Sequence, residues 1–283
     1  MHRPVFARLL LLLFVVFSLA ACAGHKASVP AAPEPPKDTD LSGDKASRIW
    51  QKLVSRAKSA EFMKGPFRIS ATLRYTGKDG KNTRVSSLLW GNGKAESPYP
   101  LRLDLLAGVG TVVAKVREDE IRFVVFAPEE KTAYVHEGSA ATLSSFGVPI
   151  PLSLSDLTLI LTGRGGLLFL PEANESRIPE DRKETPTGAH FIVANAKLAG
   201  ELEVSEQGAP LEWHEINRDG WTIIMEPGEK DPLIPQKLRI SHTQGYSALI
   251  TIKEIARVSP PFTKAQLDLP LPPGTTEKPI GSK

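Results

Sequence analysis

The sequence predicts an α+β fold of mainly β content, in which one antiparallel sheet of many strands curls beneath a few helices. Three observations carry this prediction. From residue 67 onwards, apolar and polar side chains alternate in a series of short segments, which is the period of a β-strand. The links between these segments are short and contain Gly, Asp and Pro, so consecutive strands are antiparallel neighbours. Two other segments, 44–64 and 152–161, repeat their apolar residues at helical spacing.

The N-terminus has the pattern of a secretory signal. Arg3 and Arg8 flank the start of an unbroken apolar run, 9–17, which is shorter than the about 20 residues that span a bilayer. The run is followed by Leu-Ala-Ala-Cys, ending at Cys22, which resembles the lipobox of bacterial lipoproteins. That resemblance implies cleavage before Cys22 and acylation of this residue. Cys22 is the only cysteine, so we expect no disulfide.

Four segments follow from composition. We expect a lipoprotein signal peptide at 1–21, an acylated cysteine with a Pro/Ala-rich tether at 22–43, a folded domain at 44–258 and a Pro-rich tail at 259–283. The alternative for the tether is that it packs along the domain surface. Loss of the signal lowers the formal net charge from +3 to +1, which leaves little charge to attract nucleic acid.

The first ordered element is expected to be a helix over 44–64. Ile49, Trp50, Leu53 and Ala57 form one apolar stripe. The mixed charges on its other side favour packing on a sheet over the alternative, a helix lying on a membrane surface.

Two series of strands follow. Segments 123–126 and 221–225 are apolar on both faces, so we expect helices across the mouth of a curled sheet to cover them and to enclose an apolar cavity. The acidic residues 118–120 are expected in a turn. The strands are expected at 67–75, 83–90, 101–116 (a hairpin), 121–127 and 131–137, and then at 190–196, 201–206, 211–217, 221–226, 237–242 and 248–255.

The hairpin 101–116 has an unusual tip. Gly108 and Gly110 allow the positive φ of a tight turn, and no charge occurs from residue 105 to 114. Most hairpin tips are polar because they face water. Two interpretations remain open: a hairpin tucked against the core, or a finger whose tip, Val109, touches lipid or an acyl chain.

Between the two series, 152–161 is expected to be a helix that acts as a lid or plug between two halves of the sheet. Ser153 or Ser155 can cap it and Gly163 can end it. Residues 171–188 are expected to be an exposed connector. In the tail, the alternating Leu267, Leu269 and Leu271 predict a docked extended strand.

Signatures of catalysis are weak. The sequence contains neither a nucleophile elbow nor a phosphate-binding glycine loop. Glu212 and His214 lie two residues apart on one strand face, which is a weak acid–base pair at best. We therefore expect no enzyme, no metal and no cofactor. Behind the signal peptide, the histidines are scattered without metal-ligand spacing, at His25, His136, His190, His214 and His242.

The order of these segments resembles the LolB family of outer-membrane lipoprotein receptors and their periplasmic relatives, the LolA carriers. The similarity extends from about Ser47 to about Arg257. Its most specific part is LRLDLLAGVGTVVAKV, which looks like the LolB hairpin with its protruding loop. SLSDLTLILTG looks like the mid-chain helix of the family, and RDGWTIIMEP followed by PQKLRIS looks like its late strands.

The resemblance implies a strongly curved, incomplete antiparallel barrel that is capped by helices and takes acyl chains of lipoproteins into an apolar cavity. Gly108, Val109 and Gly110 would form the loop that passes cargo to the bilayer. This chain departs from the family pattern in having Val rather than a larger Leu at the tip, and in its long connector and tail. The cavity-lining candidates are Leu105, Val112, Phe123, Val125, Leu154, Leu157, Ile160, Leu161 and Ile223.

Two functions remain open. The first is a non-enzymatic, lipid-anchored receptor on the periplasmic side of the outer membrane, a monomer that receives acylated lipoproteins from a LolA-like carrier. The second is a structural or sensor lipoprotein of the same fold that binds another lipid or a protein partner. The small residue Ala23 behind Cys22 implies outer-membrane sorting in enterobacteria.

Overall fold

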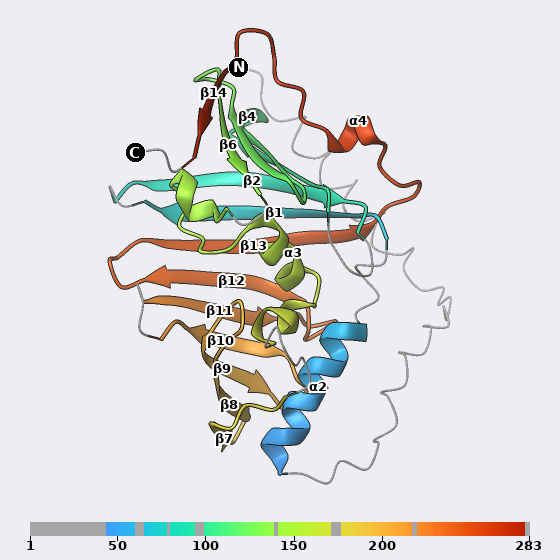
Figure 1. The fold of residues 1–283 in the computed structure, drawn as a ribbon, viewed down its shortest axis with the longest axis vertical. Coiled ribbons are helices and arrows are strands. Elements are labelled where there is room, and N and C mark those ends of the chain that lie inside the picture. Colours follow the sequence, from blue (N-terminus) through green and yellow to red (C-terminus); the bar gives the residue numbers. More distant parts are fainter. Residues whose placement is uncertain are drawn as a thin grey trace, which may run out of the picture. The chain divides into compact units, whose positions relative to one another are not determined.

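The computed structural model describes residues 44–59, 65–77, 80–93, 99–138, 141–170, 177–216 and 220–280. The predicted signal peptide, Cys22 and the tether lie outside these residues. The chain divides after Leu41, and all described elements belong to the second unit. Their strands form one 14-stranded sheet in the order β14-β6-β5-β4-β3-β2-β1-β13-β12-β11-β10-β9-β8-β7 (Figure 1).

The first meander occupies one half of this sheet. All of its turns join antiparallel neighbours, as the short links predicted. Glu118 is an exception to the expected acidic turn, because it is the last residue of a strand and is fully buried. The bounds are β1 Phe67–Thr76, β2 Asn82–Gly91, β3 Leu101–Ala107, β4 Thr111–Glu118, β5 Arg122–Ala127 and β6 Thr132–Glu137.

The second meander pairs with the first through β1 and β13, from Phe67 opposite Arg257 to Thr76 opposite Ser247. Part of the expected connector is a strand, because 182–185 pairs with its neighbour and forms an edge of the sheet. The bounds are β7 Arg182–Thr185, β8 Gly188–Val193, β9 Gly200–Ser205, β10 Pro210–His214, β11 Trp221–Pro227, β12 Pro235–His242 and β13 Ser247–Arg257.

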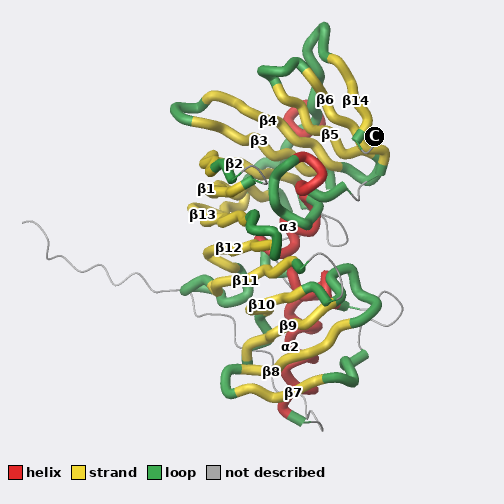
Figure 2. The backbone as a smooth tube through the Cα atoms, turned by 90° about the vertical axis from the view of Figure 1, so that its left-hand side faces the viewer, coloured by secondary structure: helices red, strands yellow, loops and turns green. Residues whose placement is uncertain are grey.

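The sheet is curved and does not close, which confirms the predicted fold class. Its edges in the described residues are β7 and β14, at opposite ends of the strand order. Figure 2 shows the strands bending around the helices Lys45–Ser59 and Leu154–Leu161, which lie on the inner face. One pairing departs from the antiparallel pattern, because β14 (Thr276–Pro279) runs parallel to β6.

Helix α2 (Lys45–Ser59) packs on the inner face of β7, β8 and β9. Its predicted apolar stripe is buried, and the ring of Trp50 lies 5.0 Å from the ring of Phe191 on β8. The interpretation of this helix as a sheet-packing element is confirmed. Residues 60–64, which we expected in its last turn, lie outside the described part of the chain.

A second helical segment crosses the inner face between β6 and β7. It consists of the 3-10 turn η2 (Leu143–Phe146), the helix α3 (Leu154–Leu161) and the 3-10 turn η3 (Gly165–Phe169). In Figure 1 it lies in front of the central strands. Because β1 and β13 pair directly, the segment covers the junction of the two meanders and does not separate two halves of the sheet.

The outer apolar face of β5 is covered by the C-terminal tail. Phe123 and Val125 join the main core, whereas Val124 and Phe126 face outwards and pack against Leu269 and Leu271. The expectation that helices cover both faces is therefore wrong for this strand. Helices α2 and α3 lie on the inner face, and the tail is the element that reaches the outer one.

The tail is fastened across the outer face by specific contacts. Phe262 exchanges two hydrogen bonds of 2.8 Å with the side chain of Asn92, and Arg102 donates to the carbonyl of Asp268 at 2.6 Å. The expected extended strand at 267–271 is wrong, because Leu267 ends the short helix α4 (Lys264–Leu267) and the strand forms later, as β14. None of the helices in the described residues is long and apolar enough to cross a membrane.

Candidate functional site

The first turn of α3 is held by a capping box. The amide of Asp156 donates to Ser153 Oγ at 3.1 Å, and the amide of Ser153 donates to the Asp156 carboxylate at 3.3 Å. Lys197 Nζ lies 2.6 Å from Asp156 Oδ1. Of the two serines considered, Ser153 is therefore the cap, and an N-cap of this kind stabilises a helix by about 1 kcal/mol.

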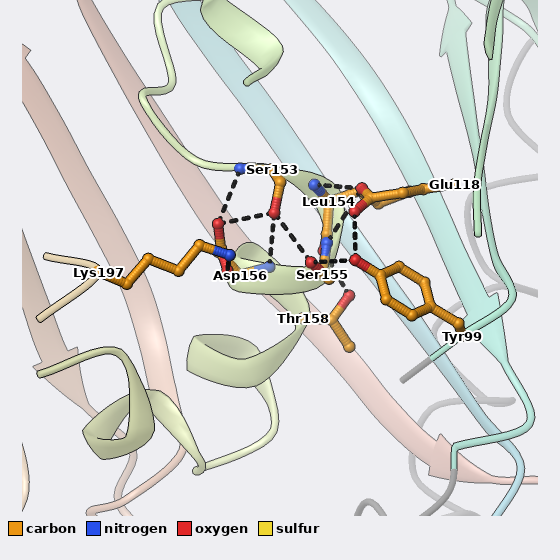
Figure 3. A network of polar contacts seen from close by, with 8 residues as sticks. All are labelled: Tyr99, Glu118, Ser153, Leu154, Ser155, Asp156, Thr158 and Lys197. Carbon is orange, nitrogen blue, oxygen red and sulfur yellow. Dashed lines mark hydrogen bonds and ion pairs between the residues drawn. The ribbon is translucent and has the colours of Figure 1, made fainter. Parts of the chain in front are cut away.

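Glu118 ties α3 to the sheet (Figure 3). Its Oε2 accepts hydrogen bonds from the amides of Leu154 at 2.7 Å and Ser155 at 3.2 Å, and Tyr99 Oη donates to its Oε1 at 2.9 Å. The first backbone amides of a helix have no hydrogen-bond acceptor within the helix. Here the carboxylate of Glu118 on β4 is that acceptor. We call Glu118, Tyr99 and the first turn of α3 the latch.

Burial raises the pKa of Glu118 to about 7 from an ordinary value of 4.5. The hydrogen bonds from Tyr99, Ser155 and Leu154 oppose this rise, and the charge of Asp156 adds to it. Because Glu118 has no exposed surface, desolvation of the charged form outweighs the hydrogen bonds. The latch therefore changes its protonation near neutral pH.

An apolar cavity, which we call the seam, lies between α3 and the sheet. Its volume is about 40 Å³. Its wall is hydrophobic apart from Ser87, and it comes from both central meanders and from the helical segment. The lining residues are Ile69, Ala71, Leu73, Ser87, Leu89, Leu103, Leu105, Leu143, Val148, Ile150, Leu157, Leu161 and Ile250.

The structure places the predicted cavity residues in three groups. Leu105, Leu157 and Leu161 line the seam. Val112 is half-buried near the hairpin tip, on β4. The rest belong to the packed core around the seam: Phe123, Val125, Leu154, Ile160 and Ile223.

The seam is closed in this conformation. Pockets that bury a small ligand have volumes of about 300 Å³ or more, several times that of the seam. The side chains of Leu105, Leu157 and Leu161 fill the space that a curled sheet would otherwise leave. An acyl chain could enter only if the α3 segment moved away from the sheet.

A larger groove, which we call the vestibule, opens at the rim of the inner face and has a volume of about 620 Å³. Val148 lines both the vestibule and the seam. On β1, Leu73 lines the seam and Tyr75, two residues further along the same face, lines the vestibule. The two spaces are therefore neighbours along the strand.

The vestibule has one aromatic wall and one hydroxyl-bearing wall. The rings of Trp221 and Tyr246 lie 5.3 Å apart, and His242 stacks on Tyr246 at 4.2 Å. Ser144 and Ser145 of η2 also line the vestibule. Such a groove can hold a group that is apolar on one side and hydrogen-bonds on the other.

The hairpin tip projects away from the seam. Gly108 and Gly110 have φ values of +54° and +94°, as predicted, and Val109 is fully exposed. Figure 2 shows the β3–β4 hairpin extending past β2 and β1 on the side opposite α3. The interpretation of a hairpin tucked against the core is therefore wrong, because the tip has no core residue over it.

The weak acid–base pair lies on the outer face of the sheet. His214 Nε2 is 2.9 Å from Glu212 Oε1, and His214 Nδ1 is 3.0 Å from Thr222 Oγ1. His214 is exposed, and Glu212 and Thr222 are half-buried. In the described residues, no group of three His, Cys, Asp or Glu side chains could hold a metal ion.

Sequence reasoning missed Glu118 and the aromatic wall of the vestibule. Glu118 continues the inward alternation of Val116, which was the available signal, but its position in an acidic triplet indicated a turn. Trp221 begins a segment whose apolar pattern predicts only a strand. Its place beside Tyr246 depends on the pairing of β11 with β12, which no local pattern shows.

Comparison with known proteins supports the fold. No protein-family model and no curated protein matches this chain. A LolA superfamily protein from Nitrosomonas europaea has a similar structure, with a TM-score of 0.51 and 10% sequence identity over 76% of this chain and 97% of that chain. At this identity the likeness shows the fold alone, which is LolA-like.

Two further structures have lower scores. An outer membrane lipoprotein-sorting protein domain from Vibrio parahaemolyticus gives a TM-score of 0.47 and 11% identity, over 79% of this chain and 96% of that chain. A DUF1329 family protein from Desulfovibrio piger gives a TM-score of 0.43 and 13% identity, over 80% of this chain and 98% of that chain. The fold assignment therefore depends on the Nitrosomonas protein.

Proposed function

We propose that this chain is a lipid-anchored receptor that binds the acyl chains of lipoproteins between α3 and the sheet and releases them into the outer membrane. The observation that carries the proposal is the seam, an apolar cavity that one short helix covers on the inner face of an unclosed sheet. The LolA-like fold and the name of the lipoprotein-sorting neighbour agree with it. Each methylene group moved from water into an apolar site gains about 0.8 kcal/mol.

Loading requires the α3 segment to open. Gly147 and Gly163 lie on either side of α3, and both have φ values of +81°. Residues that tolerate such angles suit hinges, because they absorb large backbone changes. In the closed form, Leu157 and Leu161 of α3 fill the space between the helix and the sheet. In the loaded form, the acyl chain fills this space instead.

The vestibule is the mouth through which the chain enters. An acyl chain that passes Val148 reaches the seam, while the polar head to which it is attached stays between Tyr246 and the serines of η2. This arrangement leaves the protein part of an acylated lipoprotein outside the sheet.

The remaining features of the proposal come from the sequence. Cys22 carries the lipid anchor, the tether holds the domain off the outer membrane on its periplasmic side, and Gly108, Val109 and Gly110 contact the bilayer during release. The partners are acylated lipoproteins and a LolA-like carrier, and the receptor acts as a monomer without catalysis.

A second candidate function is favoured by the small volume of the seam. If α3 never opens, the chain is a structural or sensor lipoprotein of the same fold that binds a protein partner or another lipid at its surface. The two functions differ in one property, which is access of an acyl chain to the seam.

Two neighbouring serines of β2 provide a matched test. Ser87 lines the seam and Ser86 is exposed on the outer face. In the full-length chain with Cys22→Ala, Ser87→Phe should abolish saturable binding of a fluorescent palmitate analogue, whereas Ser86→Phe should leave it unchanged. Equal binding by both variants, or no binding by the parent chain, would contradict the receptor and favour the second candidate.

A further inference from the structure

The outer face of the sheet carries a row of arginines at the centre of the molecule. Cross-strand register places Arg84 of β2, Arg74 of β1, Leu249 of β13, Arg239 of β12 and Ile224 of β11 next to one another in this order. The row lies along a shallow groove of about 490 Å³. We call it the arginine row.

Two of these arginines face each other, and no acidic side chain among the described residues pairs with either. Arg74 and Arg84 are directly opposite in the β1–β2 pair and both are exposed. Neither has a hydrogen bond or ion pair with another residue in the described part of the chain, in contrast to Arg239, whose Nε lies 2.6 Å from Glu226 Oε1. Like charges directly opposite destabilise a sheet, so this pair has a cost that folding does not explain.

Two acidic residues of this face, Glu226 and Glu212, have basic partners of their own. Glu226 binds both Arg239 and Lys237, and Glu212 lies against His214. Ile224 remains 36% exposed beside the charges. The surface is therefore positive with an apolar component, which is the composition that anionic interfaces attract.

We propose that the arginine row binds the anionic headgroups of a phospholipid membrane. The face is open and wide rather than a closed pocket, which suits a surface more than a single small anion. The β3–β4 hairpin projects on the same outer side of the sheet (Figure 2), so one bilayer could contact both. The inference goes beyond the proposed function and does not depend on it, because the row lies on the face opposite the seam.

The test measures sedimentation of the mature chain, which begins at residue 22 and carries Cys22→Ala in place of the acylated residue, with phospholipid vesicles. We expect binding to vesicles that contain phosphatidylglycerol, weakening with added salt, and little binding to phosphatidylcholine alone. Arg74→Gln and Arg84→Gln should each reduce the affinity about five-fold, the usual effect of one basic residue near an anionic surface. The same substitutions should raise the thermal stability slightly, because they remove the opposed charges.

Arg68 provides the control, since it lies on the same face of β1, is exposed and is opposite Trp90. Arg68→Gln should leave vesicle binding unchanged. An equal loss with Arg68→Gln, or equal binding to both kinds of vesicle, would overturn the proposal. Binding of soluble polyglutamate through Arg74 and Arg84 without vesicle binding would also overturn it and would indicate an acidic protein segment. If the protein binds vesicles but not palmitate, the result contradicts the proposed receptor function and supports the arginine row as a membrane-binding surface.

Discussion

The carboxylate of Glu118, at the end of β4, accepts a 2.7 Å hydrogen bond from the backbone amide of Leu154, the first residue of α3. These residues are 36 positions apart in the chain. The bond joins β4 to the helix that covers the seam. In the proposed function, a change that weakens this hydrogen bond favours opening of the α3 segment.

The pH dependence of stability follows from the raised pKa of Glu118. Between pH 4.5 and about 7 the unfolded chain has lost this proton while the folded chain still holds it, so the free energy of unfolding falls as the pH rises. We expect a loss of about 3 kcal/mol across this range, measured by denaturant unfolding. Glu118→Gln should remove this part of the slope, and an unchanged slope would contradict the assignment.

Two capping boxes in the described part of the chain give a matched pair. Ser153→Ala in α3 and Thr263→Ala in α4 each remove one cap and should each cost about 1 kcal/mol of unfolding free energy. Only Ser153→Ala should increase hydrogen exchange at 154–161 and change the affinity for a palmitate analogue. Equal effects of both variants on that affinity would show that the cap of α3 has no part in opening.

A charged residue at the hairpin tip tests whether the tip enters the bilayer. Val109→Glu should leave the unfolding free energy within about 0.5 kcal/mol, because the side chain is fully exposed. It should also preserve palmitate binding but slow the transfer of a bound lipoprotein to vesicles. Ile121→Glu, at another exposed turn, is the control. Normal transfer by Val109→Glu would mean that the tip does not enter the bilayer.

The contact of the tail with β5 predicts a stability effect at a distance from the seam. Replacing Leu269 and Leu271 with Ala should cost about 2 kcal/mol, since both are partly buried against Val124 and Phe126. Ile121→Ala, which is exposed, should cost less than about 0.5 kcal/mol. Equal values from denaturant unfolding would show that the tail is not packed on the domain.

Two glycines have similar φ angles but different surroundings. Comparing their alanine variants therefore separates the cost of backbone strain from the cost of close packing. Gly208 and Gly245 have φ values of +82° and +89°, so alanine at either position is strained by about 1 kcal/mol. A Cβ on Gly208 would also lie 2.8 Å from the amide nitrogen of Leu53 in α2, whereas Gly245 faces open space. Gly208→Ala should therefore destabilise the protein more than Gly245→Ala, in the same unfolding measurement.

The sequence was sufficient for elements whose cause is local. Alternation from Phe67 to Leu73 defines an inner face that is buried as predicted, and Ser153 with Asp156 marks the start of α3. The positive φ of Gly108 and Gly110 follows from the need for a tight turn. These features depend on residues within a few positions of one another.

The rest depends on residues that are distant in the chain. Glu118 is buried only because the amides of α3 arrive beside it, and Val124 is covered only because Leu269 returns from the tail. The volume of the seam could not be predicted either. An apolar pattern says that Leu105 and Leu161 point inwards, but whether they fill the space between helix and sheet is decided by packing.

The most direct test of the account is photocrosslinking of a diazirine-bearing palmitate to the full-length Cys22→Ala chain, followed by peptide mass spectrometry. The account predicts adducts on the walls of the seam, at Leu73, Leu105 and Leu161, that unlabelled palmitate competes away. Adducts confined to the outer face, or insensitive to competition, would contradict the claim that an acyl chain takes the place of α3.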